Sequence, residues 1–132
     1  MSRKVLDSYS LLVYIEQEEA YEKMIEYFEK AAGSGRELLL SVVNWGEVFY
    51  ITYREYGPSK AEQVGGVIET LPIEIIPVDL ELTRQAAIFK AKHRMSYADC
   101  FAAALAKLKK AELITGDKEF RQVEQEIKIN WI

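Results

Sequence analysis

The 132-residue sequence has one cysteine and one histidine, and both scarcities exclude whole classes of protein. With Cys100 alone, no disulfide can form within the chain. A single histidine, His93, excludes zinc fingers, ribonucleases that use a pair of histidines, and other sites that need several soft ligands. No apolar run is long enough to cross a membrane, and none near the first residues is long enough for the core of a signal peptide. We therefore expect a cytoplasmic protein with no membrane partner.

Aspartate is also scarce. Of the 21 acidic side chains, 17 are glutamate and only four are aspartate. Aspartate is poorly suited to helix interiors and is favoured at helix caps, turns and functional sites, so each one is expected to have a reason for its position. The four are Asp7, Asp79, Asp99 and Asp117.

Positive charge is unevenly distributed along the chain. The net charge is −4, which argues weakly against a nucleic-acid partner. Residues 84–110, however, hold seven basic side chains and one acid, a local charge of +6, and that one acid is Asp99. This basic stretch is either a solvated helix face that balances an acidic protein or a surface that attracts phosphate groups.

Short apolar runs alternate with longer helical patterns, and no linker, repeat or low-complexity segment interrupts them. This alternation predicts βα units around a mostly parallel sheet, within one domain that spans residues 1–132. The expected strands are 4–6, 37–41, 73–78, 113–115 and 127–131, the last at a sheet edge. Four helices are expected at 9–15, 18–32, 43–56 and 58–71, and Gly33 and Gly35 are expected to end the second of them. Two more helices are expected to begin at the caps Asp79 and Ser96, the first of them ending at about residue 92. A short helix is expected from residue 118.

Four acids fall where the strands end or where the next helix begins. Asp7 and Asp117 directly follow predicted strands, Glu47 lies about one turn into a helix, and Asp99 is in the first turn of another. In an open parallel sheet, the carboxyl ends of the strands and the helix N-termini that follow them share one edge, where ligands bind. We therefore expect these four carboxylates to converge at that edge.

Each of these acids also has an ordinary structural interpretation. Asp7 and Asp117 suit helix caps, and Asp99 suits a capping box. Glu47 could interact with its helix dipole at the surface, although its apolar neighbours argue for a buried helix. Asp79 fits a helix cap and nothing else.

A cluster of carboxylates favours a bound cation. Acids that are brought together repel one another, and at least one has a raised pKa in the absence of metal. Oxygen ligands without His or Cys partners suit Mg²⁺ or Mn²⁺. Such ions typically serve phosphate chemistry, in which they activate a water molecule and stabilise the leaving oxygen. The predicted cluster thus indicates a metal-assisted reaction at a phosphate group.

Four segments resemble the motifs of PIN domains, and these motifs are most similar to those of the VapC-type toxins. They are VLDS (5–8), NWGEV (44–48), MSYADCFAAA (95–104) and LITGDKEF (113–120). Their order and spacing and the length of the chain agree with the family, so the resemblance covers essentially the whole chain. It implies a three-layer α/β/α sandwich around a short, mostly parallel sheet. It also implies a metal-dependent endoribonuclease that leaves 5′-phosphate and 3′-hydroxyl ends.

The resemblance also implies roles for individual residues and for partners. The implied catalytic and metal-binding acids are Asp7, Glu47, Asp99 and Asp117, and the implied supporting hydroxyls are Ser8 and Thr115. Weaker candidates for contacts to the substrate are Lys92, Arg94 and Lys118. Members of the family usually form homodimers and are held inactive by a small antitoxin protein.

Other reactive or aromatic side chains have simpler interpretations. His93 suits the C-terminal end of a helix, and Cys100 is expected to be a packed thiol where the family usually has a small residue such as alanine. Aromatic rings can stack on the bases of single-stranded nucleic acid, and five tyrosines are candidates for this role. For most of them, packing in the core or at a protein interface is the favoured interpretation. The candidates are Tyr9, Tyr14, Tyr50, Tyr53 and Tyr56.

Two functions compete with an RNA-cleaving toxin of a toxin–antitoxin pair. One is a non-catalytic module that binds RNA or protein and uses the acids only as caps, and the intact acid set argues against it. The other is a phosphoryl-transfer protein of the receiver or phosphatase type. Such sites need a nucleophilic aspartate with a close acidic partner, and the residues after Asp7 lack the Asp-x-Asp spacing.

Overall fold

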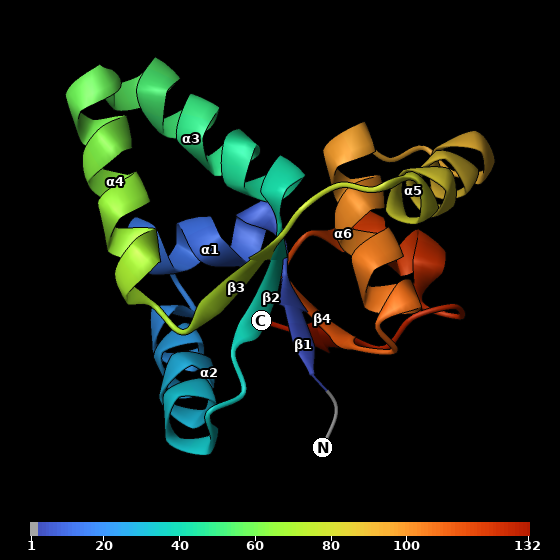
Figure 1. Cartoon of the computed structure of the whole chain (residues 1–132), viewed down its shortest axis with the longest axis horizontal. Helices are drawn as coiled ribbons and strands as arrows, with labels where there is room; N and C mark the ends of the chain where they lie inside the picture. Colours follow the sequence, from blue (N-terminus) through green and yellow to red (C-terminus); the bar gives the residue numbers. More distant parts are fainter. Residues whose placement is uncertain (1–2) are drawn as a thin grey trace.

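The computed structural model describes residues 3–132 and contains a five-stranded parallel sheet between two layers of helices (Figure 1). The strands are β1 (Lys4–Leu6), β2 (Leu38–Ser41), β3 (Ile73–Ile76), β4 (Glu112–Thr115) and β5 (Ile129–Trp131). The helices are α1 (Ser8–Ile15), α2 (Tyr21–Ser34), α3 (Val42–Tyr56), α4 (Pro58–Thr70), α5 (Leu80–Lys92), α6 (Tyr97–Leu108) and the 3₁₀ helix η1 (Lys118–Val123). The predicted α/β/α sandwich is confirmed.

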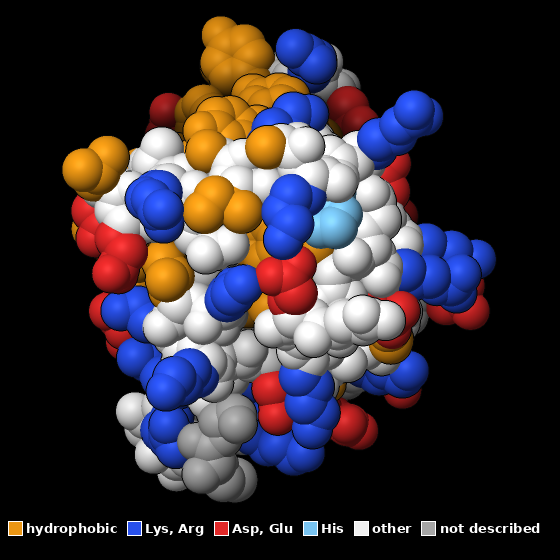
Figure 2. Space-filling view, turned by 90° about the vertical axis from the view of Figure 1, so that its right-hand side faces the viewer, with side chains coloured by type: hydrophobic (Ala, Val, Ile, Leu, Met, Phe, Trp, Pro, Cys, Tyr) orange, Lys and Arg blue, Asp and Glu red, His pale blue; other side chains and the backbone are white. Residues whose placement is uncertain are grey.

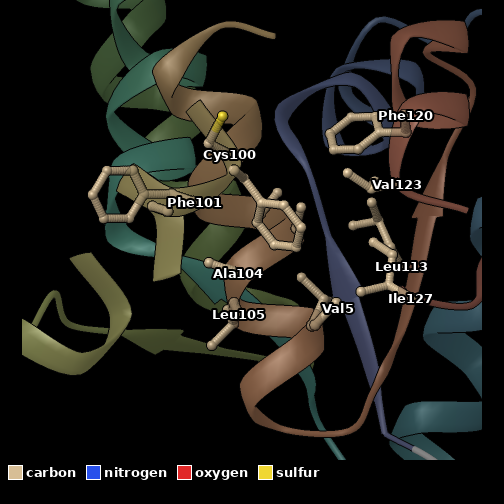
Figure 3. Packing of buried hydrophobic residues seen from close by; sticks show 14 of the residues in the cluster. Val5, Cys100, Phe101, Ala104, Leu105, Leu113, Phe120, Val123 and Ile127 are labelled. Carbon is tan, nitrogen blue, oxygen red and sulfur yellow. The ribbon is translucent and has the colours of Figure 1, made fainter. Parts of the chain in front are cut away.

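Alternate residues of the strands build two cores, one on each face of the sheet. Val5, Leu39 and Leu113 pack with α5 and α6, as Figure 3 shows for Val5 and Leu113. The next residue of each strand packs with α1, α2, α3 and α4 on the other face. Because both faces are covered, the central strands are apolar throughout rather than alternating with polar residues.

Helix α6 lies closely against the sheet because it is rich in alanine. Every residue from Asp99 to Ala106 is buried, and four of them are alanines that let the helix backbone approach the strands. Cys100 is buried in this layer as expected, and burial raises the pKa of its thiol. This close packing holds Asp99, at the start of the helix, near the end of β1.

The strand order β3-β2-β1-β4-β5 puts β1 in the middle of the sheet. The chain builds outward on one side from β1 to β3 and then returns to add β4 and β5 on the other side. The carboxyl ends of β1 and β4 therefore flank a topological switch point, which is where open α/β sheets bind ligands. Asp7 leaves β1 and Asp117 follows β4 at this position.

Several predicted element boundaries were wrong by a few residues. Helix α2 starts at Tyr21 instead of 18, because Ala20 adopts a left-handed conformation with φ of 75°. It continues through Gly33, and only Gly35, with φ of 69°, ends it. Strand β3 stops at Ile76, before a proline that cannot donate to a ladder.

The C-terminal part differs in a similar way. The helix after Asp117 is of the 3₁₀ type, and the last strand starts at Ile129 rather than at 127, because Ile127 still donates its backbone N–H to the carbonyl of Val123. Strand β5 is at an edge, as predicted. Among the described residues, 3–132, no helix combines the length and apolar character that a bilayer crossing requires.

Candidate active site

Asp7 is the most deeply buried acid of the site. Its carboxylate accepts hydrogen bonds from the backbone N–H of Ser10 at 2.8 Å and from Thr115 Oγ1 at 2.5 Å. The backbone N–H of Asp7 in turn donates to Ser10 Oγ, which completes a capping box at the start of α1. Burial raises the pKa of Asp7 to about 6, although the bond from Thr115 opposes the shift. Asp7 is therefore both a helix cap and an acid whose pKa is raised by burial.

Thr115 joins the two strand ends at the switch point. Its buried hydroxyl donates to Asp7 and accepts from the backbone N–H of Asp117 at 3.0 Å. The carboxylate of Asp117 accepts the backbone N–H of Glu119 at 3.0 Å and so caps η1, as expected. One hydroxyl thus fixes Asp7 relative to the loop that carries Asp117.

Glu47 reaches the same edge from α3. It is half-buried in the second turn of the helix, and its carboxylate accepts a short hydrogen bond from Ser8 Oγ. Ser8 is the residue directly after Asp7, so this bond ties the start of α1 to α3. The supporting roles implied for Ser8 and Thr115 remain proposals, but both hydroxyls do bind acids of the candidate site.

Asp99 enters the cluster from the first turn of α6. Its backbone N–H donates to Ser96 Oγ at 3.1 Å, which is one half of the expected capping box. The other half, a hydrogen bond from the backbone N–H of Ser96 to the Asp99 carboxylate, is not formed, although the Ser96 hydroxyl acts on that carboxylate and lowers its pKa slightly. The side chain is nevertheless only 8% exposed. Among the three aspartates of the candidate site, Asp99 is thus the one whose carboxylate does not cap a helix.

The pKa values show that the four acids share one electrostatic environment. The pKa of Asp99 rises to about 7, chiefly through burial. The negative charges of Asp117, Asp7 and Glu47, in that order, raise it further. The charge of Asp117 also raises the pKa of Asp7. The structure therefore places the four carboxylates within electrostatic range of one another.

The donor set fits a hard divalent cation. Within residues 3–132, no three His, Cys, Asp or Glu side chains already stand in a metal-binding arrangement. The cluster offers only carboxylate and hydroxyl oxygens, which are the ligands that Mg²⁺ and Mn²⁺ prefer over the softer metals. One of its acids, Asp99, has a carboxylate that caps no helix in the described chain.

Sequence reasoning missed two side chains that support the site. Ser10 completes the Asp7 cap, and the spacing Asp-x-x-Ser was the signal for it. Asn44 is fully buried one turn before Glu47, and its Nδ2 donates to the carbonyl of Ala98 at 3.1 Å. This bond joins α3 to the start of α6, and an amide in a mostly apolar helix was the signal for it.

The three cationic candidates are exposed, and one of them, Lys92, acts on Glu126 rather than on the acid cluster. Arg94 is exposed in the loop between α5 and α6, and its backbone N–H and carbonyl bind the side chain of Gln122 in η1 at 2.9 and 3.2 Å. Lys118 is exposed next to Asp117, and Lys92 is exposed at the end of α5. The loop that carries Arg94 is thus attached to the 3₁₀ helix that Asp117 caps.

Part of the basic stretch is used inside the fold. Lys107 Nζ lies 2.7 Å from Glu126 Oε1, and Lys90 donates to the carbonyl of Met95 at 2.8 Å. His93 ends α5 with its Nε2 at 3.8 Å from Glu126 Oε2, which agrees with its expected structural role. Figure 2 shows Lys and Arg side chains scattered over this side of the molecule, with acids among them. Two of the seven basic side chains in residues 84–110 are therefore engaged within the fold.

A cavity of about 440 Å³ lies away from the acid cluster, at the amino-terminal edge of the sheet. Two of its cations are already paired, Arg3 with Glu74 at 2.9 Å and Lys4 with Glu112 at 2.8 Å. None of the four clustered acids lines it. The cavity therefore adds nothing to the chemistry of the candidate site.

A sequence model of the PIN domain family matches residues 4–126. The chain belongs to the PIN domain family. PIN domain toxins of the VapC type are typically nucleases, and PIN domain nucleases generally use divalent metals. A search among curated proteins gave no match.

Solved VapBC and VapC structures share the fold at low sequence identity. VapBC2 from Rickettsia felis, bound to a DNA fragment from its promoter, has a TM-score of 0.79 and 14% identity over 96% of each chain. DNA-bound VapBC from Salmonella typhimurium has a TM-score of 0.79 and 17% identity over 98% of each chain. VapC20 from Mycobacterium tuberculosis, a toxin that cleaves the sarcin–ricin loop, has a TM-score of 0.71 and 13% identity over 91% of this chain and 94% of that chain.

Thr115→Val should disturb the PIN site without adding or removing charge. Valine has the same shape but cannot donate to Asp7, so the pKa of Asp7 should rise further, and the backbone N–H of Asp117 loses its acceptor. We expect a loss of about 1–3 kcal/mol in the free energy of unfolding. Carboxyl-carbon NMR titration measures the pKa, and urea denaturation measures the stability. Thr115→Ser keeps the hydroxyl and should restore both values, and an unchanged Asp7 pKa in Thr115→Val would contradict the assigned bond.

Proposed function

We propose that this chain is a single PIN domain acting as a Mg²⁺- or Mn²⁺-dependent endoribonuclease, the toxin of a type II toxin–antitoxin pair. The observation that carries the proposal is the convergence of Asp7, Glu47, Asp99 and Asp117 at the switch point of a PIN fold. These four acids would hold the ion or ions. Because RNA is the substrate, the toxin would act in the cytoplasm.

The side chains of the site would position the acids and set the pH range in which they can bind an ion. Mg²⁺ or Mn²⁺, when bound, lowers the pKa of water and offsets phosphate charge. Thr115 and Ser8 orient the Asp7 and Glu47 carboxylates by hydrogen bonds. Asp99, whose pKa is raised to about 7, must lose its proton before it can serve as a ligand, so cleavage should increase as the pH rises through neutrality.

The proposed partners are a second copy of the chain and a small antitoxin protein. Two of the structural neighbours are VapBC complexes, in which a toxin is bound by its antitoxin. Helix α3 also carries three exposed tyrosines on its C-terminal half that suit a protein contact. They are Tyr50, Tyr53 and Tyr56.

A non-catalytic module is the competing function, and the helix caps are the observation that favours it. Asp7, Asp79 and Asp117 all cap helices. The other two acids weigh against it, because Glu47 lies within a helix and the Asp99 carboxylate caps nothing in residues 3–132. Metal binding without cleavage of any RNA would favour the module, whereas cleavage that requires added Mg²⁺ or Mn²⁺ supports the nuclease.

Arg94→Ala should weaken RNA binding through the loss of one phosphate contact. The side chain is exposed beside the start of α6, and within residues 3–132 it forms no ion pair. The slope of log affinity against log salt should decrease by about 0.7, the value per contact for single strands. The measurement is binding of a short single-stranded RNA to cleavage-deficient Asp99→Asn protein over a salt series.

Lys109→Ala is the matched control for Arg94→Ala. Lys109 caps the far end of α6, about 15 Å from Asp99 at 1.5 Å per residue. Its removal deletes the same charge but should leave the salt slope on a short RNA unchanged. Equal salt slopes with and without Arg94→Ala would show that the whole basic stretch is a solvated face with no role in RNA binding.

A further inference from the structure

Tyr9 is held against the loop that carries Asp117. It is the second residue of α1, two positions after Asp7. A Cβ atom at position 116 would lie only 2.5 Å from Tyr9 Cε1 and 2.9 Å from Tyr9 Cζ, closer than real side chains approach. The ring therefore contacts the backbone of Gly116, and the absence of a side chain there is what allows the contact.

The part of the Tyr9 ring that does not contact Gly116 is exposed to solvent. Tyr9 is 44% exposed, and within residues 3–132 no other aromatic ring or cation stacks on it. Two of the other exposed tyrosines have a covered ring. The Arg54 guanidinium lies 5.0 Å from the Tyr50 ring, and Tyr97 packs on Phe101 with ring centroids 5.0 Å apart. Tyr9 is thus an unpaired aromatic surface.

The position of Tyr9 is fixed by the same bonds that build the site. The capping box of Asp7 and Ser10 holds the start of α1, and the bond from Ser8 to Glu47 ties it to α3. Neighbouring Cα atoms are about 3.8 Å apart, so Gly116 places the ring within a nucleotide's reach of the Asp117 backbone. The ring is thus held at the edge of the site with a large part of its surface open to solvent.

We propose that Tyr9 is a stacking platform for the nucleobase next to the phosphodiester that is cleaved. The inference rests on the proposed function, since it requires RNA at the acid cluster. Aromatic stacking accepts every base, because each has a π-face, and it changes affinity by a factor of about 5 to 150 per base. Tyr9 would therefore set the position of the strand at the acids rather than select a base sequence.

Tyr9→Leu should raise KM by a factor of about 5 or more and leave kcat within about twofold, because stacking contributes to binding in the ground state and transition state alike. Tyr9→Phe keeps the ring and should retain the wild-type KM. The substrate is a mixed-sequence single-stranded RNA with one mapped cleavage site. Tyr27→Leu is the control, because Tyr27 lines the cavity at the amino-terminal edge of the sheet, away from the four acids.

A scan with abasic substrates separates stacking from a structural effect. One base at a time is removed at the positions that flank the cleavage site. At one of these positions the wild type should lose affinity to the level of Tyr9→Leu, and the two proteins should then have the same KM. A KM for Tyr9→Leu equal to the wild-type value on the intact RNA would overturn the proposal, as would a KM difference that persists on every abasic substrate.

Gly116→Ala provides a second variant that leaves Tyr9 itself intact. Its methyl group must displace the ring, so KM should rise as in Tyr9→Leu, and the double variant should be no worse than either single one. Additive losses would show that the Gly116 change acts through Asp117, and they would contradict the proposed contact. If wild-type protein neither cleaves nor binds the RNA, the proposed function fails, whereas normal cleavage by Tyr9→Leu defeats this inference alone.

Discussion

Asp99→Asn should lower the rate of RNA cleavage by a factor of about 10² or more while the fold persists. The substitution removes one negative charge from the acid cluster and so weakens the hold on a divalent cation, which contributes several kcal/mol to the transition state of phosphate chemistry. The local structure is not at risk, because the cap of α6 uses the backbone N–H of residue 99, which asparagine retains. Asp7→Asn and Asp117→Asn should have effects of similar size.

Asp79→Asn is the matched control for these three variants. Asp79 also caps a helix, since its carboxylate accepts the backbone N–H of Leu82 at 2.8 Å, but it is exposed at the start of α5. Asparagine caps a helix about as well as aspartate, so both stability and cleavage should stay close to wild type. Cleavage rates are measured on one RNA, with circular dichroism to check folding. Loss of activity in Asp79→Asn as complete as in Asp99→Asn would show that the site is wrongly assigned.

The metal-free protein should lose stability as the pH rises from about 4 to about 7. The pKa of Asp7 is about 6 and that of Asp99 about 7 in the folded protein, both above the ordinary value of 3.8. Between these pH values the folded state binds more protons than the unfolded state, so the free energy of unfolding falls with increasing pH. For the fully buried Asp7, a shift of about two pKa units corresponds to about 3 kcal/mol as an order of magnitude.

Other carboxylates act in the opposite direction and in a different pH range. Glu112 and Glu126 have lowered pKa values because lysines donate hydrogen bonds to them. Their contribution is lost only as the pH falls below about 4.5. Thermal denaturation in EDTA between pH 4 and 8 should therefore show a maximum in Tm near the lower end of that range.

Asp117→Asn isolates the repulsion within the cluster. The charge of Asp117 raises the pKa of both Asp7 and Asp99, and asparagine can still cap η1. At pH 8 without metal, this variant should be more stable than wild type by about 0.5–2 kcal/mol. Added Mn²⁺ should then raise the Tm of wild type more than that of the variant, because it binds the native state. If wild type and Asp117→Asn have identical metal-free melting curves and identical increases in Tm with Mn²⁺, the four acids do not repel one another as proposed.

Much of the site was predictable because it follows from strand ends. Parallel strands place the residues after them at one edge, so the positions of Asp7 and Asp117 in the sequence already indicated where their carboxylates would meet. Asp99 was predictable from the serine that caps its helix. These inferences depend only on local sequence and on the shared direction of the strands.

The contacts that build the detail of the site are not local, and the sequence did not predict them. Thr115 reaches Asp7 only because β1 and β4 are neighbours, and strand order is set by packing across the whole sheet. The contact between Tyr9 and Gly116 has the same origin. The start of α2 was missed for a different reason, because a non-glycine residue with positive φ, Ala20, has no signature in the sequence.

Metal-dependent hydrolysis is tested most directly by cleavage of an end-labelled RNA in Mg²⁺, in Mn²⁺ and in EDTA, with identification of the product ends. Asp99→Asn protein, purified in parallel, controls for contaminating ribonucleases. We expect cleavage by wild type only with metal, products with 5′-phosphate and 3′-hydroxyl ends, and little or none from Asp99→Asn. Equal cleavage in EDTA, or products with 2′,3′-cyclic phosphate ends, would contradict a nuclease site built from the four carboxylates.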